Sequence, residues 1–173
     1  MDYAGWGLQK VSDKLALGYN PMPIEGNLVV MPDGEMKALL RCTENTGVLL
    51  RMDCNAPEAA LEFEKIVDFP MAHSKFEIRK GEKSNYVAIG NILPRRVVMS
   101  VYTSDDCMVW NKKTDILNYS HKDFDGVYIG VQYPSFFVEN QTVNVLVRAA
   151  INNADNFHDA NYILFCREEI EGI

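Results

Sequence analysis

Short apolar segments separated by turn residues recur along this chain, whereas helical periodicity is almost absent. The clearest case is the stretch of residues 24–41, in which two apolar runs flank Pro32-Asp33-Gly34-Glu35. Proline presets φ in such a turn and glycine accepts a positive φ, so the stretch predicts a β-hairpin. A hairpin brings its two ends together. Glu25 and Arg41 are therefore predicted to lie at the same edge of one sheet.

The other strand signals follow at a regular spacing. Strands are predicted over residues 27–31, 36–41, 48–52, 76–78, 86–89, 97–102, 127–131, 136–138, 143–147 and 162–166. The stretch 56–64 carries Pro57 near its start and is interpreted as a loop or a single turn. Short strands with turn signals at this spacing indicate an all-β sandwich or propeller.

The predicted strands fall into three sets, near residues 27–68, 73–113 and 127–168. Each set is close to the length of one four-stranded propeller blade. The predicted fold is therefore all-β and of the β-propeller type, with about three four-stranded antiparallel blades in a single domain over residues 1–173.

Composition excludes several partners. The net charge of −7 opposes nucleic acid and anionic membranes, which need a basic surface. No apolar run is long enough to cross a bilayer, and the chain does not begin like a signal peptide. No CxxC pair is present, and His73 and His121 have no companions at ligand spacing, so we predict no metal or cofactor. The four cysteines are interpreted as free thiols.

The segment TSDDCMVW at residues 103–110 resembles an Asp-box, the S-x-D-x-G-x-x-W turn between the outer strands of sialidase-type blades. Thr103 replaces the serine and Cys107 replaces the glycine. In such a turn the aspartate accepts backbone N–H groups and the tryptophan packs beneath it. The role of this motif is structural.

A wider resemblance covers roughly residues 6–167. It is carried, in order, by IEGNLVVMPDGEMKALLR, DFPMAHSKFEIR, RRVVMSVYTSDDCMVW, GVQYPSF and VLVRAAINNADNFHDANYILF. This order resembles the C-terminal half of bacterial sialidase-like six-bladed β-propellers with Asp-box (BNR) repeats. The resemblance implies exo-α-sialidase chemistry, in which three arginines hold the carboxylate of the sugar and a tyrosine attacks the anomeric carbon.

The resemblance also implies a role for individual residues. Tyr133 matches the nucleophile, and Glu25 matches the glutamate that takes its proton. Arg41 matches the second arginine, and either Arg96 or Arg95 matches the third. The catalytic aspartic acid and the first arginine belong to the N-terminal half of that family, and no segment here matches them.

Each of these residues also has a structural interpretation. Glu25 would cap a turn, Arg41 would protect a sheet edge, and Tyr133 would be a packed aromatic. Arg148 is predicted to form a structural salt bridge rather than to reach the cleft. His158-Asp159 is predicted to form a side-chain-bonded corner rather than a catalytic dyad.

The leading function predicted is a sialidase-like glycoside hydrolase, or part of one, acting on an acidic sugar. The alternatives are a glycan-binding module without catalysis and a structural half-propeller. Because an open stack of blades exposes surfaces that neighbours would cover, we predict self-association or association with a missing N-terminal half. The resemblance implies a secreted or periplasmic bacterial protein, and a cytoplasmic location stays open.

Overall fold

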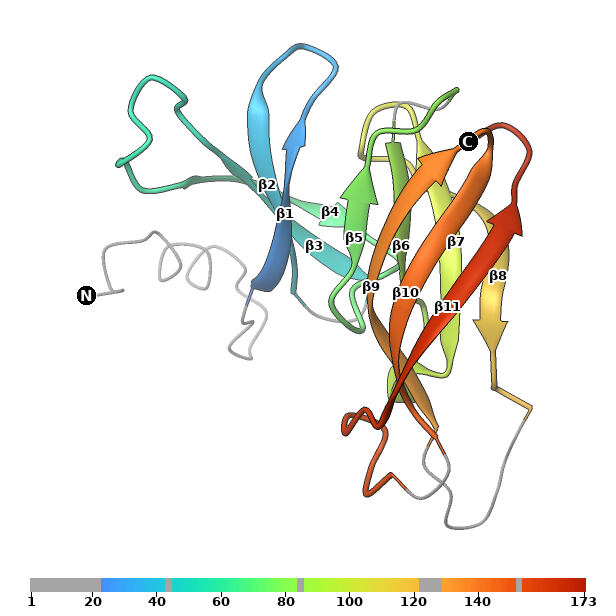
Figure 1. Ribbon diagram of the computed structural model, residues 1–173. Helices are drawn as coiled ribbons and strands as arrows, with labels where there is room; N and C mark the ends of the chain where they lie inside the picture. The colour runs from blue at the N-terminus through green and yellow to red at the C-terminus, as the bar shows by residue number, and fades with distance from the viewer. Residues whose placement is uncertain (1–22, 43–44, 84–85, 122–128, 152–153) are drawn as a thin grey trace.

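The computed structural model describes residues 23–42, 45–83, 86–121, 129–151 and 154–173, which form three antiparallel β-sheets side by side (Figure 1). The first sheet has the order β1-β2-β3-β4, with β1 Ile24–Val30, β2 Met36–Arg41, β3 Thr46–Arg51 and β4 Glu62–Asp68. The second has the order β5-β6-β7-β8, with β5 Glu77–Arg79, β6 Tyr86–Asn91, β7 Val98–Ser104 and β8 Asn111–Asn118. The third has the order β11-β10-β9, with β9 Gly130–Glu139, β10 Thr142–Ala150 and β11 Tyr162–Glu169.

The predicted strands are confirmed in their order, but two further strands were missed. The strands β4 and β8 lie at the outer edges of their sheets and carry many exposed charged residues. Because few of their side chains are buried, the apolar alternation that marks a strand is weak there. The third sheet has three strands within the described ranges, against the four predicted. Residues 127 and 128 of one predicted strand, and residues 1–22 of the predicted domain, lie outside the described residues.

The predicted hairpin turn is confirmed. Gly34 has a φ of 87°, which an L side chain would strain, and its N–H donates to the carbonyl of Met31 at 2.9 Å. The Asp33 carboxylate accepts the N–H of Glu35 at 3.0 Å, as expected of an aspartate in a turn. These local bonds set the register of β1 against β2.

Two apolar cores join the three sheets. One core lies between the first and second sheets and contains Leu39, Leu49, Phe69 and Phe76. The other lies between the second and third sheets; it includes Val87, Ile89, Met99, Val143, Val145 and Val147. The second sheet is therefore covered on both faces by its neighbours.

The first strand of each sheet lies next to the first strand of the following sheet. The short strand β5 contacts β1 on one side and β9 on the other, and all three run in the same direction (Figure 1). The Asn27 side chain bonds the backbone of Phe76 and Ile78, both at 3.1 Å. The Glu77 carboxylate accepts the N–H of Phe136 at 2.8 Å. These polar bonds tie the three first strands to one another.

The turn between β7 and β8 is held by two side chains. Oδ1 of Asp106 accepts the N–H groups of Met108 and Val109, both at 2.8 Å. The Ser104 hydroxyl accepts the N–H of Cys107 at 2.9 Å and donates to Asp106. The side chain that caps this turn is thus Asp106, one residue after the position that the Asp-box alignment gives to the aspartate.

Cys107 has a φ of 63°, the left-handed backbone that a glycine adopts in the Asp-box pattern. Its thiol is buried, and burial raises its pKa to about 12. Trp110 packs below the turn, with its ring 5.8 Å from that of Phe69. None of the four cysteines forms a disulfide, as predicted; they are Cys42, Cys54, Cys107 and Cys166.

Substitution Asp106→Ala is expected to lower the free energy of unfolding at pH 7 by about 1–2 kcal/mol, because two backbone N–H groups lose a charged acceptor. Hydrogen bonds from backbone N–H groups, above all that of Val109, hold the pKa of the Asp106 carboxyl below its usual value. The carboxylate therefore stabilises the fold above about pH 4, and its contribution is lost as the pH falls further. Urea denaturation at pH 7 and pH 3 tests this. An equal effect of the substitution at both pH values would contradict it.

Candidate functional site

Glu25 and Arg41 meet at the open end of the β1–β2 hairpin, as predicted. The strand register shifts between Ile24 and Gly26, so Glu25 sits in a β-bulge with a φ of 49°. A bulge redirects the side chain of the extra residue. Oε2 of Glu25 accepts a hydrogen bond from Nε of Arg41 at 2.7 Å, and both side chains are partly buried.

Tyr133 lies in a second bulge, in the first half of β9. The register of β9 against β10 shifts between Leu146 and Arg148, so Tyr133 and Pro134 together oppose one residue of β10. Tyr133 has a φ of 53°. Proline lacks a backbone donor and is tolerated inside a sheet at bulges, which explains why β9 continues through Pro134 where two separate strands were predicted.

Two arginines flank the Tyr133 ring. The guanidinium carbon of Arg148 is 5.0 Å from the ring centroid, and that of Arg96 is 6.0 Å away. Both distances fall in the range of a cation–π contact. The His158 ring stands edge-on to the Tyr133 ring, with 6.3 Å between centroids. We call Arg96, Gln132, Tyr133, Arg148 and His158 the Tyr133 cluster.

Gln132 fixes one side of the Tyr133 cluster. It is fully buried, accepts a hydrogen bond from the Arg96 guanidinium and donates to the carbonyl of His158 at 2.7 Å. Arg95 and Arg96 both have left-handed backbones, with φ of 66° and 58°, in the short 3-10 turn η2 (Pro94–Arg96). Arg96 points into the cluster whereas Arg95 is exposed, so the structure separates the two arginines that the sequence left open.

The segment before β11 is a corner held by side chains, as predicted. Oδ1 of Asn156 accepts the N–H groups of His158 at 2.7 Å and Asp159 at 3.2 Å. The Asn161 amide exchanges two hydrogen bonds with the backbone of Ile151, at 3.0 and 2.6 Å. Nδ1 of His158 is 3.9 Å from Oδ1 of Asp159, and both side chains are about half exposed. This arrangement does not suit an oriented catalytic dyad.

Arg148 is the member of the cluster whose role the sequence assigned differently. A structural salt bridge was predicted, but no carboxylate in the described part of the chain lies within ion-pair distance of it. Its guanidinium lies against Tyr133 instead. One feature of the sequence does indicate that the Arg148 side chain is outside the core: it lies on the strand face opposite to Val145 and Val147.

Glu25 and Tyr133 lie toward the same end of the stack, because both occupy the first halves of strands that run in one direction (Figure 1). Glu25 contacts Arg41, whereas Tyr133 contacts side chains of the Tyr133 cluster. The predicted pairing of Glu25 with Tyr133 as base and nucleophile stays a prediction.

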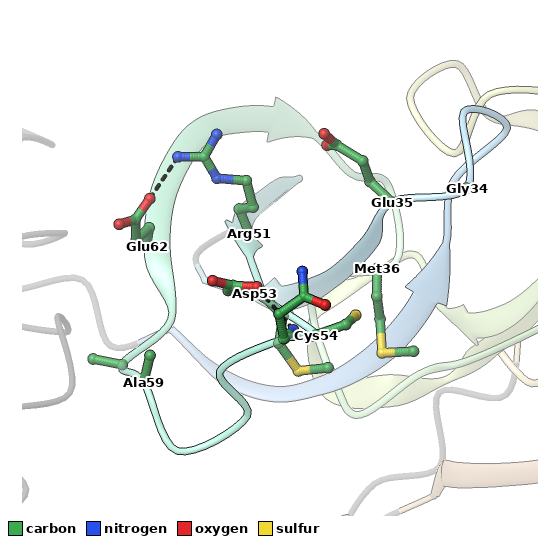
Figure 2. Close-up of a pocket in the computed structure, with 11 residues that line it drawn as sticks. Gly34, Glu35, Met36, Arg51, Asp53, Cys54, Ala59 and Glu62 are labelled. Carbon is green, nitrogen blue, oxygen red and sulfur yellow. Dashed lines mark hydrogen bonds and ion pairs between the residues drawn. The ribbon is translucent and has the colours of Figure 1, made fainter.

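Two hollows in the described part of the chain lie elsewhere. One, of about 510 Å³, is bordered by the hairpin turn and the loop before β4, and Figure 2 shows the Arg51–Glu62 ion pair and Cys54 at its wall. The other, of about 450 Å³, lies between β1 and the second sheet. Both include the turn end of the β1–β2 hairpin, opposite to Glu25 and Arg41.

No group of three or more His, Cys, Asp or Glu side chains that could hold a metal ion comes together among the described residues. Within the same part of the chain, no helix has the length and apolar character that a membrane span requires.

The chain matches no known family model and no curated protein sequence. Solved structures do match. An α-L-arabinanase of Penicillium chrysogenum complexed with arabinobiose aligns with 85% of this chain and 46% of its own, at 11% identity and a TM-score of 0.55. A GH43 β-1,3-galactosidase with galactodeoxynojirimycin aligns with 100% of this chain and 50% of its own, at 12% identity and a TM-score of 0.55.

These sheets are blades of a β-propeller. The predicted fold class is thereby confirmed, and the chain spans about half the length of the two propellers that it matches. Both of those proteins are glycoside hydrolases, and neither is a sialidase. The resemblance predicted from the motifs is thus confirmed as far as a glycosidase-type propeller fold.

Proposed function

We propose that this chain contributes the tyrosine-bearing half of a sialidase-like glycoside hydrolase site that takes a sugar with a carboxylate. The observation that carries the proposal is the backbone of Glu25, Arg96 and Tyr133, with φ of 49°, 58° and 53°. Left-handed backbone is costly for such residues and clusters at functional sites. Two of the three also sit in β-bulges, which re-aim side chains next to active sites.

The charges of the Tyr133 cluster support an anionic ligand. Arg96 and Arg148 bring two positive charges to one tyrosine, and neither has a carboxylate partner among the described residues. The planar guanidinium binds a carboxylate through two parallel hydrogen bonds. In a chain with a net charge of −7, this local excess of positive charge favours an acidic sugar. A carbohydrate as ligand also fits the sugar complexes of the two structural neighbours.

The proposed chemistry uses a neutral nucleophile because a carboxylate would be repelled by the acid group of the sugar. The Tyr133 oxygen forms a bond to the anomeric carbon as the bond to the leaving group breaks. The phenol proton passes to Glu25, whose Oε2 is bonded to Arg41. Arg41, Arg96 and Arg148 hold the sugar carboxylate.

A second candidate function is glycan binding without hydrolysis. The observation in its favour is that Glu25 accepts a hydrogen bond from Arg41 at 2.7 Å. A glutamate held in that pair serves to orient Arg41 for a ligand rather than to accept a proton.

The test is covalent labelling with a 3-fluoro-N-acetylneuraminosyl fluoride. Fluoride leaves without being protonated, so the step does not depend on an acid residue. The bond from Tyr133 to the anomeric carbon forms, the carbon–fluorine bond breaks, and Glu25 takes the phenol proton. We expect a mass increase of one sugar residue that peptide mapping places on Tyr133. The variant Glu25→Gln is expected to slow labelling by about 10²- to 10⁴-fold.

Matched variants distinguish the two functions. Tyr133→Phe should abolish labelling, whereas Tyr162→Phe, which changes an exposed tyrosine of β11, should leave it unchanged. Equal labelling of wild type and Tyr133→Phe would refute the nucleophile. If wild type is not labelled but binds N-acetylneuraminate, and Arg96→Ala weakens that binding while exposed Arg51→Ala does not, the second function holds instead.

A further inference from the structure

Three sulfur-bearing side chains line the hollow of about 510 Å³ at the turn end of the first blade, and they are Met36, Met52 and Cys54. Figure 2 shows the side chains of Met36 and Cys54 at the wall of this hollow. Cys54 is exposed and forms no disulfide, and the two methionines are partly buried. We call these three residues the sulfur cluster. None of them belongs to the Tyr133 cluster.

The strand register brings Met36 and Met52 together. The strands β2 and β3 are antiparallel, and Lys37 pairs with Arg51. One position further along, the N–H of Met52 donates to the carbonyl of Met36 at 3.3 Å, so these two residues oppose each other. Opposed residues project their side chains from the same face of a sheet, with Cβ atoms about 4.5–5.5 Å apart. The two thioethers are therefore neighbours, although no spacing along the sequence indicates it.

A turn after β3 holds Cys54 beside this pair. Oδ1 of Asp53 accepts the N–H of Asn55 at 2.9 Å, and the carbonyl of Asp53 accepts the N–H of Ala56 at 3.1 Å. An aspartate that bonds the backbone two residues further on fixes a turn in this way. The turn begins directly after Met52, so it keeps the thiol at the same hollow as the two thioethers.

The carboxylates at this hollow already have partners. Glu62 accepts a hydrogen bond from Arg51 at 2.5 Å, Glu35 lies 3.2 Å from the ammonium group of Lys37, and Asp53 holds its own turn. Of the charged side chains that line the hollow, three are acidic and one is basic, a balance that favours a cation. The sulfur atoms are left as the ligands that such a cation would meet.

The chemistry of these ligands selects the kind of ion. Thiolate and thioether sulfur favour soft ions such as Cu(I), whereas Mg²⁺ and Ca²⁺ take oxygen ligands. Zinc sites in proteins are built from Cys, His, Asp and Glu, and no three of these converge among the described residues. One thiol and two thioethers at a single hollow therefore suit a soft monovalent cation.

We propose that the sulfur cluster binds Cu(I), with Cys54 as a thiolate and Met36 and Met52 as neutral ligands. The thiol proton passes to solvent as the bond between copper and sulfur forms, and the charge of the thiolate balances that of the ion. The inference does not depend on the proposed function, because no residue of the sulfur cluster takes part in the glycosidase chemistry.

The test is competition for Cu(I) between the full chain and the chelator bicinchoninate, without oxygen, followed by the absorbance of the chelator complex. Wild type is expected to take one Cu(I) ion per chain from the chelator, and Cys54→Ser should not. The double variant Met36→Leu/Met52→Leu keeps every thiol. Its Cu(I) affinity should fall about 100-fold, since even changes beyond the direct ligands of a metal cost about 10- to 100-fold. Leucine is similar to methionine in volume, so this variant should fold, which circular dichroism checks.

Met108→Leu and Cys166→Ser are the matched controls, because both side chains are partly buried and pack on cores away from the hollow. Both should bind Cu(I) as wild type does. Unchanged affinity in the double methionine variant would show that a thiol binds alone, and would overturn the inference. Absence of Cu(I) binding by wild type, or an equal affinity for Zn²⁺, would also overturn it. X-ray absorption of the wild-type copper complex is a second readout that needs no variant: sulfur neighbours are expected, and nitrogen or oxygen neighbours would contradict the site.

Discussion

Replacing Phe69 by alanine is expected to lower the free energy of unfolding by about 3–5 kcal/mol. Phe69 is fully buried at the junction of the first and second blades. Its ring centroid is 4.4 Å from that of Phe76 and 5.8 Å from that of Trp110. Alanine would leave a cavity where three aromatic rings meet, and neighbouring strands that are held by ladders cannot close it fully. Urea denaturation followed by tryptophan fluorescence measures the change.

Val109→Ala is the control for this substitution, because that side chain is exposed and changes stability by about 0.5 kcal/mol or less. Losses of similar size in the two variants would mean that Phe69 does not join the blades as described. If Phe69→Ala changes only the slope of the unfolding free energy against urea concentration and leaves the midpoint unchanged, the substitution alters the compactness of the unfolded or native state instead.

Replacing Gly130 by alanine is expected to damage the Tyr133 cluster. A Cβ at this position would lie 2.2 Å from the carbonyl oxygen of Phe157 and 2.9 Å from its Cβ. Because the first of these is a backbone atom, the corner that precedes β11 has to move away from β9. That corner accepts the hydrogen bond of Gln132 and packs the Phe157 ring against Arg96. We expect a loss of stability of about 1–3 kcal/mol.

Binding of N-acetylneuraminate by calorimetry should be lost in Gly130→Ala. Gly34→Ala is the matched control, because its Cβ meets no atom within 4 Å and its φ of 87° costs only about 1–2 kcal/mol of backbone strain. Gly34 lies at the far end of the hairpin from Arg41, so ligand affinity in that variant should equal that of wild type. Unchanged affinity in Gly130→Ala would show that the corner does not shape the site.

The strands that could be predicted from the sequence are those that bury one face. Val143, Val145 and Val147 recur at every second position because they point into a core. The turn at Gly34 is recognisable because its positive φ favours glycine. The outer strands β4 and β8 were missed because they are largely exposed and charged, so partner strands rather than apolar alternation specify them. Strand β9 was divided at Pro134 because the bulge that accommodates the proline depends on β10.

Within the candidate site, the contact of Glu25 with Arg41 could be predicted from the sequence, whereas the contacts of the Tyr133 cluster could not. The hairpin register brings Glu25 to Arg41, a pairing that the position of the turn implies. Arg95 and Arg96 are adjacent, and only the left-handed turn η2 decides which one reaches Tyr133. The position of Arg148 against Tyr133 depends on a register shift between two strands, which no local pattern encodes.

We expect an acidic sugar to bind at the end of the propeller that carries the Tyr133 cluster and Arg41. Backbone NMR of the labelled chain during titration with N-acetylneuraminate tests it most directly, with N-acetylmannosamine as the neutral control. We expect shifts at Glu25, Arg96 and Tyr133 with the acid alone. Shifts confined to the hollow around Arg51 and Cys54 (Figure 2), or equal shifts with the neutral sugar, would contradict it.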